Sequence, residues 1–138
     1  MDNPLLSLDP EDAMRRVEDW KARADALAAN ALAASERLQA LTATASDDNG
    51  TVTITVDADG IMTKIELSHR VQKQSAHFTE DAVMEVYRAA QAKLAEAAKE
   101  VVADSVGPGS ATGRALMAGY ERRLERLDEP GEHREERR

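Results

Sequence analysis

The middle of this chain has apolar side chains two positions apart, whereas the long segments on either side have them three and four apart. In Thr51–Val56 valine and isoleucine alternate with threonine, and in Ile61–Leu67 apolar residues alternate with Lys64 and Glu66. Period two is typical of a strand buried on one face. The turn signals at 48–50 and 57–60 each contain a glycine able to take a positive φ. The sequence therefore predicts a β-hairpin, or a three-stranded meander if residues 41–45 also pair.

The segment before this β-unit predicts a helix over about residues 10–40. Asp9 followed by Pro10 is typical of a helix start. From Ala13 to Leu41 apolar residues recur at spacings of four and three, which places them on one continuous heptad stripe. At 1.5 Å per residue the helix is about 45 Å long, so it extends beyond any small core.

The segment after the β-unit predicts two further helices. The second opens at Thr79, with Phe78 and Val83 at the positions of a hydrophobic staple, and ends before the glycine and proline residues of 106–109. A shorter third helix spans about 112–127. The charged stretch that follows has no apolar residue, and we expect it to be disordered.

The element order predicts an α+β fold. It consists of a long N-terminal helix, a small antiparallel hairpin or three-stranded meander, a second long helix and a short C-terminal helix. We expect a single domain over residues 1–127, with its core at about 10–105 and a tail at 128–138.

The apolar content is 42% but includes only one Phe, one Trp and two Tyr. Alanine-rich helices leave a monomer short of buried area, and a symmetric homodimer is the usual remedy. The residues that we expect to pack in the core or in the dimer interface are Val17, Trp20, Leu27, Leu38, Val52, Ile54, Val56, Ile65, Leu67, Tyr87 and Leu94.

We find no combination of residues that indicates catalysis. Cysteine is absent, which excludes thiol chemistry, disulfides and Cys-ligated zinc. His69 and His77 lack an acidic pair at ligand spacing. The glycines at 107–113 are not followed by Lys-Ser/Thr and come after a helix, so they indicate a hinge and not a phosphate loop. We expect no catalytic residue, no metal and no cofactor.

The chain shows no apolar run of membrane-spanning length, and its first residues are acidic. The expectation is therefore a protein of the cytoplasm without a signal peptide or membrane span.

The order of the elements and the central strands resemble the YbaB/EbfC family of small bacterial nucleoid-associated proteins. The residues that carry the resemblance are Gly50, Val52, Ile54, Val56, Asp59, Gly60, Ile65, Glu66 and Leu67, followed by Asp81 in the second helix. It covers about residues 10–105. The resemblance implies a homodimer that binds double-stranded DNA with little or no sequence preference, is associated with the nucleoid and is not an enzyme.

The charge of the chain departs from what a DNA-binding protein usually shows. The net charge is −8, and residues 1–50 carry ten acidic and five basic residues, whereas family members typically have a first helix rich in Lys, Gln and Met. DNA binding then requires that cations gather on one surface. Judged by charge alone, the candidates are Arg15, Arg16, Lys64, Arg70, Lys73, Arg114, Arg122, Arg123 and Arg126. The alternative is an acidic paralogue that does not bind DNA and serves as an accessory scaffold for a protein partner, for example in a secretion system.

Overall fold

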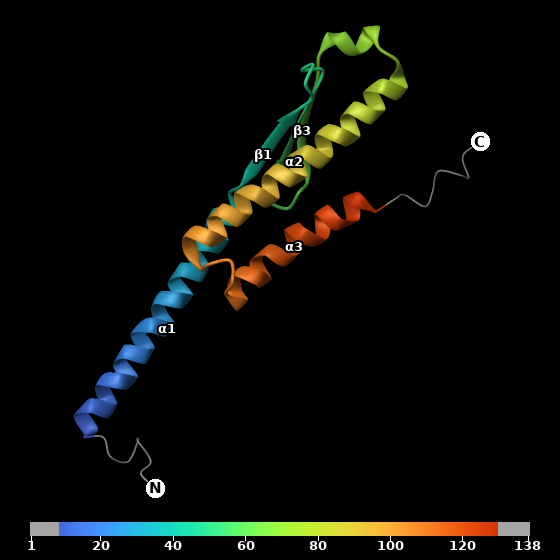
Figure 1. The fold of residues 1–138 in the computed structure, drawn as a ribbon. Helices are drawn as coiled ribbons and strands as arrows, with labels where there is room; N and C mark the ends of the chain where they lie inside the picture. The colour runs from blue at the N-terminus through green and yellow to red at the C-terminus, as the bar shows by residue number, and fades with distance from the viewer. Residues whose placement is uncertain (1–8, 130–138) are drawn as a thin grey trace.

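A computed structural model describes residues 9–129 of the chain (Figure 1). The elements in chain order are the helix α1 (Pro10–Gln39), the strands β1 (Thr42–Ser46), β2 (Val52–Asp57) and β3 (Met62–Leu67), the 3₁₀ helix η1 (His69–Lys73), and the helices α2 (Ala76–Ser105) and α3 (Ala111–Asp128). The α+β fold is confirmed, and the sheet is the three-stranded meander.

The sheet has the order β1-β2-β3, and both pairs of strands are antiparallel. Tight turns join the strands, with Gly50 at φ +66° and Gly60 at φ +77°, so glycine stands where a side chain would strain the backbone. One face of the sheet is polar, and there the hydroxyls of Thr44 and Thr55 lie 2.9 Å apart across β1 and β2.

The other face of the sheet forms the core with α2. Val52, Ile54 and Val56 of β2 are completely buried, and Val86 and Leu94 of α2 lie in the same apolar cluster. Of the three strands, the helix packs mainly against β1 and β2. Strand β3 is therefore at the margin of the covered area.

Helix α1 packs against α2 only through its last turns. Ala34 and Leu38 are buried there, and Arg37 donates from Nη1 to Ser105 Oγ over 3.5 Å. The earlier part of α1 extends past the C-terminal end of α2 (Figure 1). We call residues 10–33 the α1 arm; its stripe residues Val17, Trp20 and Leu27 are each 64–68% exposed.

The predicted start of α2 at Thr79 is wrong. Ser75 is the N-cap, because its Oγ accepts a hydrogen bond from the backbone N–H of Phe78 at 3.1 Å. Thr79 lies inside the first turn, where its hydroxyl donates to the carbonyl of Ser75. Phe78 is consequently a half-exposed helical residue and not part of a staple.

Helix α3 turns back along α2. Its N-cap Ser110 accepts from the N–H of Gly113, and Tyr120 is buried against the core. Within residues 9–129, no helix has the length and apolar character needed to cross a membrane. The tail predicted at 128–138 lies outside the described residues from Pro130 onwards.

Candidate nucleic-acid interface

The predicted DNA-binding cations lie in separate parts of the molecule. Arg15 and Arg16 are on the α1 arm, whereas Arg70 and Lys73 belong to η1, which lies at the opposite end of the fold (Figure 1). Lys64 is on β3, and Arg114, Arg122, Arg123 and Arg126 are on α3. A single chain therefore does not gather these cations on one surface.

Several of these side chains are engaged within the chain. Lys64 Nζ lies 2.6 Å from Glu66 Oε1, and the hydrogen bond and attraction to that carboxylate raise the pKa of Lys64. Arg15 pairs with Asp12. Arg70 donates to the carbonyl of Asn49 at 3.1 Å, and Arg114 donates to that of Gly109 at 3.0 Å.

Arg123 also has an intramolecular role. Its guanidinium lies over the ring of Tyr120, with 5.2 Å from Cζ to the ring centroid, and its side chain approaches Gly60 in the β2–β3 turn. The Arg123 side chain therefore lies between α3 and the β2–β3 turn.

Four of the predicted cations have no hydrogen-bond or ion-pair partner among residues 9–129, and all four are exposed. They are Arg16, Lys73, Arg122 and Arg126. Arg122 and Arg126 are one helical turn apart on α3, so they project from the same face. These side chains are free to contact phosphates.

The α1 arm carries two exposed cations that sequence reasoning did not select, Lys21 and Arg23. Together with Arg16 they flank the apolar stripe on both sides, whereas the acidic residues of the arm lie farther round the helix. The heptad positions could have identified these cations, because the positions next to the stripe carry basic and neutral residues only.

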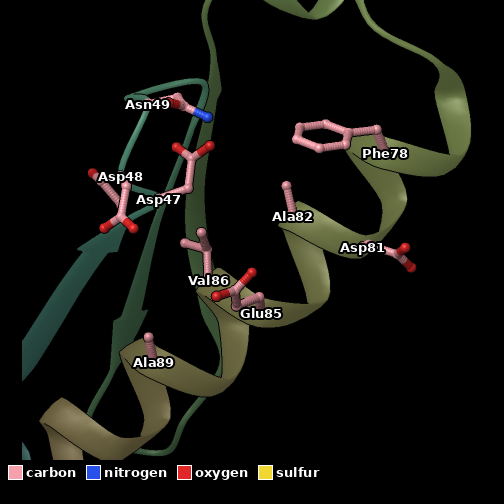
Figure 2. A pocket seen from close by; sticks show the side chains of 10 residues that line it. Asp47, Asp48, Asn49, Phe78, Asp81, Ala82, Glu85, Val86 and Ala89 are labelled. Atoms are coloured by element: carbon pink, nitrogen blue, oxygen red, sulfur yellow. The ribbon is translucent and has the colours of Figure 1, made fainter.

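A pocket of about 410 Å³ between the β1–β2 turn and the first turns of α2 has the opposite charge (Figure 2). Asp47, Asp48, Asp81 and Glu85 line it, with Phe78 at its rim. Such a cluster of carboxylates repels phosphate groups. No group of three or more His, Asp or Glu side chains within residues 9–129 is arranged to hold a metal ion.

Asp47 has a structural role at this pocket. Its Oδ1 accepts hydrogen bonds from the backbone N–H groups of Thr51 at 2.7 Å and Val52 at 3.0 Å, and Oδ2 accepts from the Thr51 hydroxyl. Burial by itself raises the pKa of Asp47, but these hydrogen bonds outweigh it and lower the pKa below its ordinary value.

The fold thus defines a small α+β protein with a helix–meander–helix core and a projecting, cation-bearing arm. The model of the YbaB/EbfC DNA-binding family matches residues 12–109, from the arm to the end of α2. The chain therefore belongs to the YbaB/EbfC DNA-binding family, which is not a family of enzymes, and the resemblance seen in the sequence is confirmed. The match stops before α3. Neither the curated proteins nor the solved structures contain a match to the chain.

Proposed function

We propose that this chain is a nucleoid-associated protein of the bacterial cytoplasm that binds double-stranded DNA as a homodimer with little sequence preference. The observation that carries the proposal is the family match, which spans the arm, the sheet and α2 without interruption. Binding of this kind coats or bridges duplex through phosphate contacts and so affects nucleoid organisation.

The distribution of charge supports phosphate contact by particular surfaces. The net charge of −8 opposes approach to DNA over most of the molecule, but the arm and α3 carry exposed arginines away from the acidic pocket. In a homodimer each cluster of exposed arginines occurs twice, so cations from two chains can contact one duplex. The assignment of the individual cations stays a prediction.

Exposed apolar residues support the homodimer. In a single chain Val17, Trp20 and Leu27 on the arm are largely exposed, and Ile65 and Leu67 on β3 are about half exposed. Large uncovered apolar patches on small proteins mark interaction surfaces.

The test is a fluorescence-anisotropy titration of labelled duplex DNA with micromolar dimer, at low salt and again at high salt. Two duplexes of unrelated sequence should bind with similar affinity, and log K should fall linearly with log salt concentration. If no duplex is bound at low salt, the proposal fails.

The acidic pocket favours a second candidate function, a scaffold for a protein partner. Its four carboxylates and the half-exposed Phe78 suit a basic segment with an apolar residue. The same titration separates the two functions, because the scaffold function predicts a stable dimer that does not change the anisotropy of the labelled duplex. A charge reversal of the pocket, Asp81→Lys with Glu85→Lys, would then abolish co-purification with the partner and leave the dimer intact.

A further inference from the structure

A groove of about 590 Å³ runs between α2 and α3. Ala92 and Ala95 line it from α2, and Met117 and Leu124 line it from α3. Ala92 is two residues from the buried Leu94, so it lies on the side of α2 that faces away from the sheet. Because α3 turns back along α2 (Figure 1), the groove follows the two helices. It is an apolar channel of the size of a ligand pocket.

The two helices that form the groove run antiparallel. Gly113, in the first turn of α3, lies so close to the end of α2 that a Cβ added to it would be 3.1 Å from Val102 Cγ1. Farther along α3, Arg123 reaches Gly60, whose carbonyl is bonded to Gln91 in the middle of α2. The residue numbers therefore give the order of the lining side chains along the groove.

The groove carries opposite charges at its two ends. Lys99 and Arg114 lie at the end nearest the α2–α3 connection, and Glu96 and Glu121 lie farther from it. Within residues 9–129 Lys99, Glu96 and Glu121 form no ion pair, and Arg114 donates to the carbonyl of Gly109. An occupant with the reverse order of charges would be attracted at both ends.

Neither end of the chain suits the groove. Residues 130–138 have charged side chains but no large apolar one. Residues 1–8 contain three leucines, but the α1 arm carries them about 36 Å away from the end of α2. Eight extended residues span at most about 29 Å and cannot return over that distance. The occupant therefore comes from another molecule.

We propose that the groove between α2 and α3 binds an amphipathic helix of a partner protein. The apolar side chains of this helix lie on Met117 and Leu124. It has carboxylates at the end beside Lys99 and Arg114, and Lys or Arg at the other end. Recognition of this kind places an apolar helix face in a groove and uses flanking charges to fix its direction.

The shape of the groove favours a helix as the occupant. Two helices side by side leave a cleft along both axes, and a third helix packs into such a cleft through its ridges of side chains. The small side chains of Ala92 and Ala95 let its backbone come close to α2. The lining from Arg114 to Leu124 extends about 15 Å, which is about three helical turns.

The groove is separate from the features that support the proposed function. One of its walls, α3, lies beyond residues 12–109, which the family model matches. The acidic pocket lies at the β1–β2 turn and shares no residue with it. Binding of a helix here depends on neither DNA nor the homodimer, and so goes beyond the proposed function.

Peptide selection on the full-length protein tests the proposal. The probe is a phage-displayed library of helical peptides of about 14 residues, with apolar residues fixed at heptad positions a and d and the other positions varied. Selected peptides should carry carboxylates at one end and Lys or Arg at the other. If no peptide is enriched on the wild type over the Met117→Glu variant, the proposal is overturned.

The selected peptide, labelled with fluorescein, is then titrated by anisotropy. Met117→Glu should weaken its binding about tenfold or more, because a carboxylate then lies on the apolar floor. Ala115→Glu is the matched control, since residue 115 is exposed on the opposite side of α3 and should bind like the wild type. Equal losses in the two variants would show that the peptide binds elsewhere.

An exchange of charges tests the direction of the bound helix. Lys99→Glu with Glu121→Lys keeps the net charge and changes only exposed residues, so the fold should be retained in circular dichroism. The double variant should bind the selected peptide about tenfold more weakly and recover affinity for a peptide with its charged ends exchanged. Unchanged affinity for both peptides contradicts the assigned charges.

Sedimentation distinguishes a partner helix from a second copy of the chain. Met117→Glu should leave self-association unchanged, and a weaker dimer would mean that the groove is covered by another copy, which overturns the proposal. The peptide results and the DNA titration fail independently. A wild type that binds no duplex still selects peptides, and a groove that selects none leaves DNA binding intact.

Discussion

Gln91 of α2 donates a hydrogen bond from Nε2 to the carbonyl oxygen of Gly60 over 2.7 Å. Gln91 is buried, and this bond ties the middle of α2 to the turn between β2 and β3. Arg123 of α3 lies over the same turn, so that three elements meet at a glycine. The turn is thus a packing centre as well as a strand connection.

Replacement of Gly60 by alanine should destabilise the protein more than the same change at Gly50. Both glycines have positive φ, so each alanine carries strain of about 1–2 kcal/mol. Only at Gly60 does the new Cβ collide with neighbours, at 2.6 Å from Arg123 Nη1 and 2.9 Å from Gln91 Oε1, whereas nothing lies within 4 Å at Gly50. We expect an additional loss of about 1–3 kcal/mol in the free energy of unfolding, measured by urea denaturation. Equal losses for the two variants would show that the turn is not packed in this way.

Asp47→Ala should destabilise the β1–β2 turn. The substitution removes the carboxylate acceptor of the Thr51 and Val52 backbone N–H groups, at a cost of about 1–3 kcal/mol near neutral pH. Asp48→Ala is the matched control, because Asp48 is the exposed neighbour in the same turn. A comparable loss in the control would contradict the role of Asp47.

The same contribution should depend on pH. Hydrogen bonds to the carboxylate lower the pKa of Asp47 in the folded chain, so the ionised form stabilises the fold. The stabilisation is fully present above the unfolded pKa of about 3.9 and is lost as pH falls through the lowered folded value. The difference in unfolding free energy between the wild type and Asp47→Ala should therefore shrink at acid pH. A constant difference would rule out linkage through Asp47.

Local patterns in the sequence were sufficient for most of the fold. Alternation in residues 51–56 and 61–67, glycine in both turns and the Asp9-Pro10 start each depend on neighbouring residues, and the structure has strands, turns and a helix there. The predicted start of α2 was wrong because Ser75 and Thr79 are both residue types that cap helices. In the structure η1 ends at Lys73, and α2 begins shortly after it with Ser75 as its N-cap.

The arrangement of the candidate interface depends on how residues far apart along the chain are placed in the fold, and local sequence patterns do not give this placement. Arg16 and Arg70 are both cations in the sequence, but the straight course of α1 puts them at opposite ends of the fold. Heptad spacing likewise predicts one stripe from Ala13 to Leu41, yet only its last turns find a partner in the chain. Which part of a stripe is covered depends on where α2 ends.

Tyr120 should titrate above its ordinary value. Burial raises its pKa, Arg123 opposes the rise and the carboxylate of Asp59 adds to it. The Tyr87→Phe variant leaves Tyr120 as the only tyrosine, so phenolate absorbance reports it alone. We expect a midpoint above 10 in the folded chain. Because the unfolded chain loses this proton first, the stability should fall as pH rises from the unfolded value of about 10 through the folded midpoint. A midpoint at or below 10 would mean that α3 leaves Tyr120 in water.

Removal of Arg122 and Arg126 together should weaken DNA binding and reduce its dependence on salt. The two side chains share a face of α3, are exposed and have no partner within residues 9–129, so each is free to neutralise a phosphate. Two lost phosphate contacts should make the slope of log K against log salt concentration shallower by about 1.8. Lys64→Ala is the control, because Lys64 is already paired with Glu66, and its slope should stay close to that of the wild type. An unchanged slope in the Arg122→Ala/Arg126→Ala variant would remove α3 from the interface and leave the arm and η1 as the phosphate-contacting surfaces.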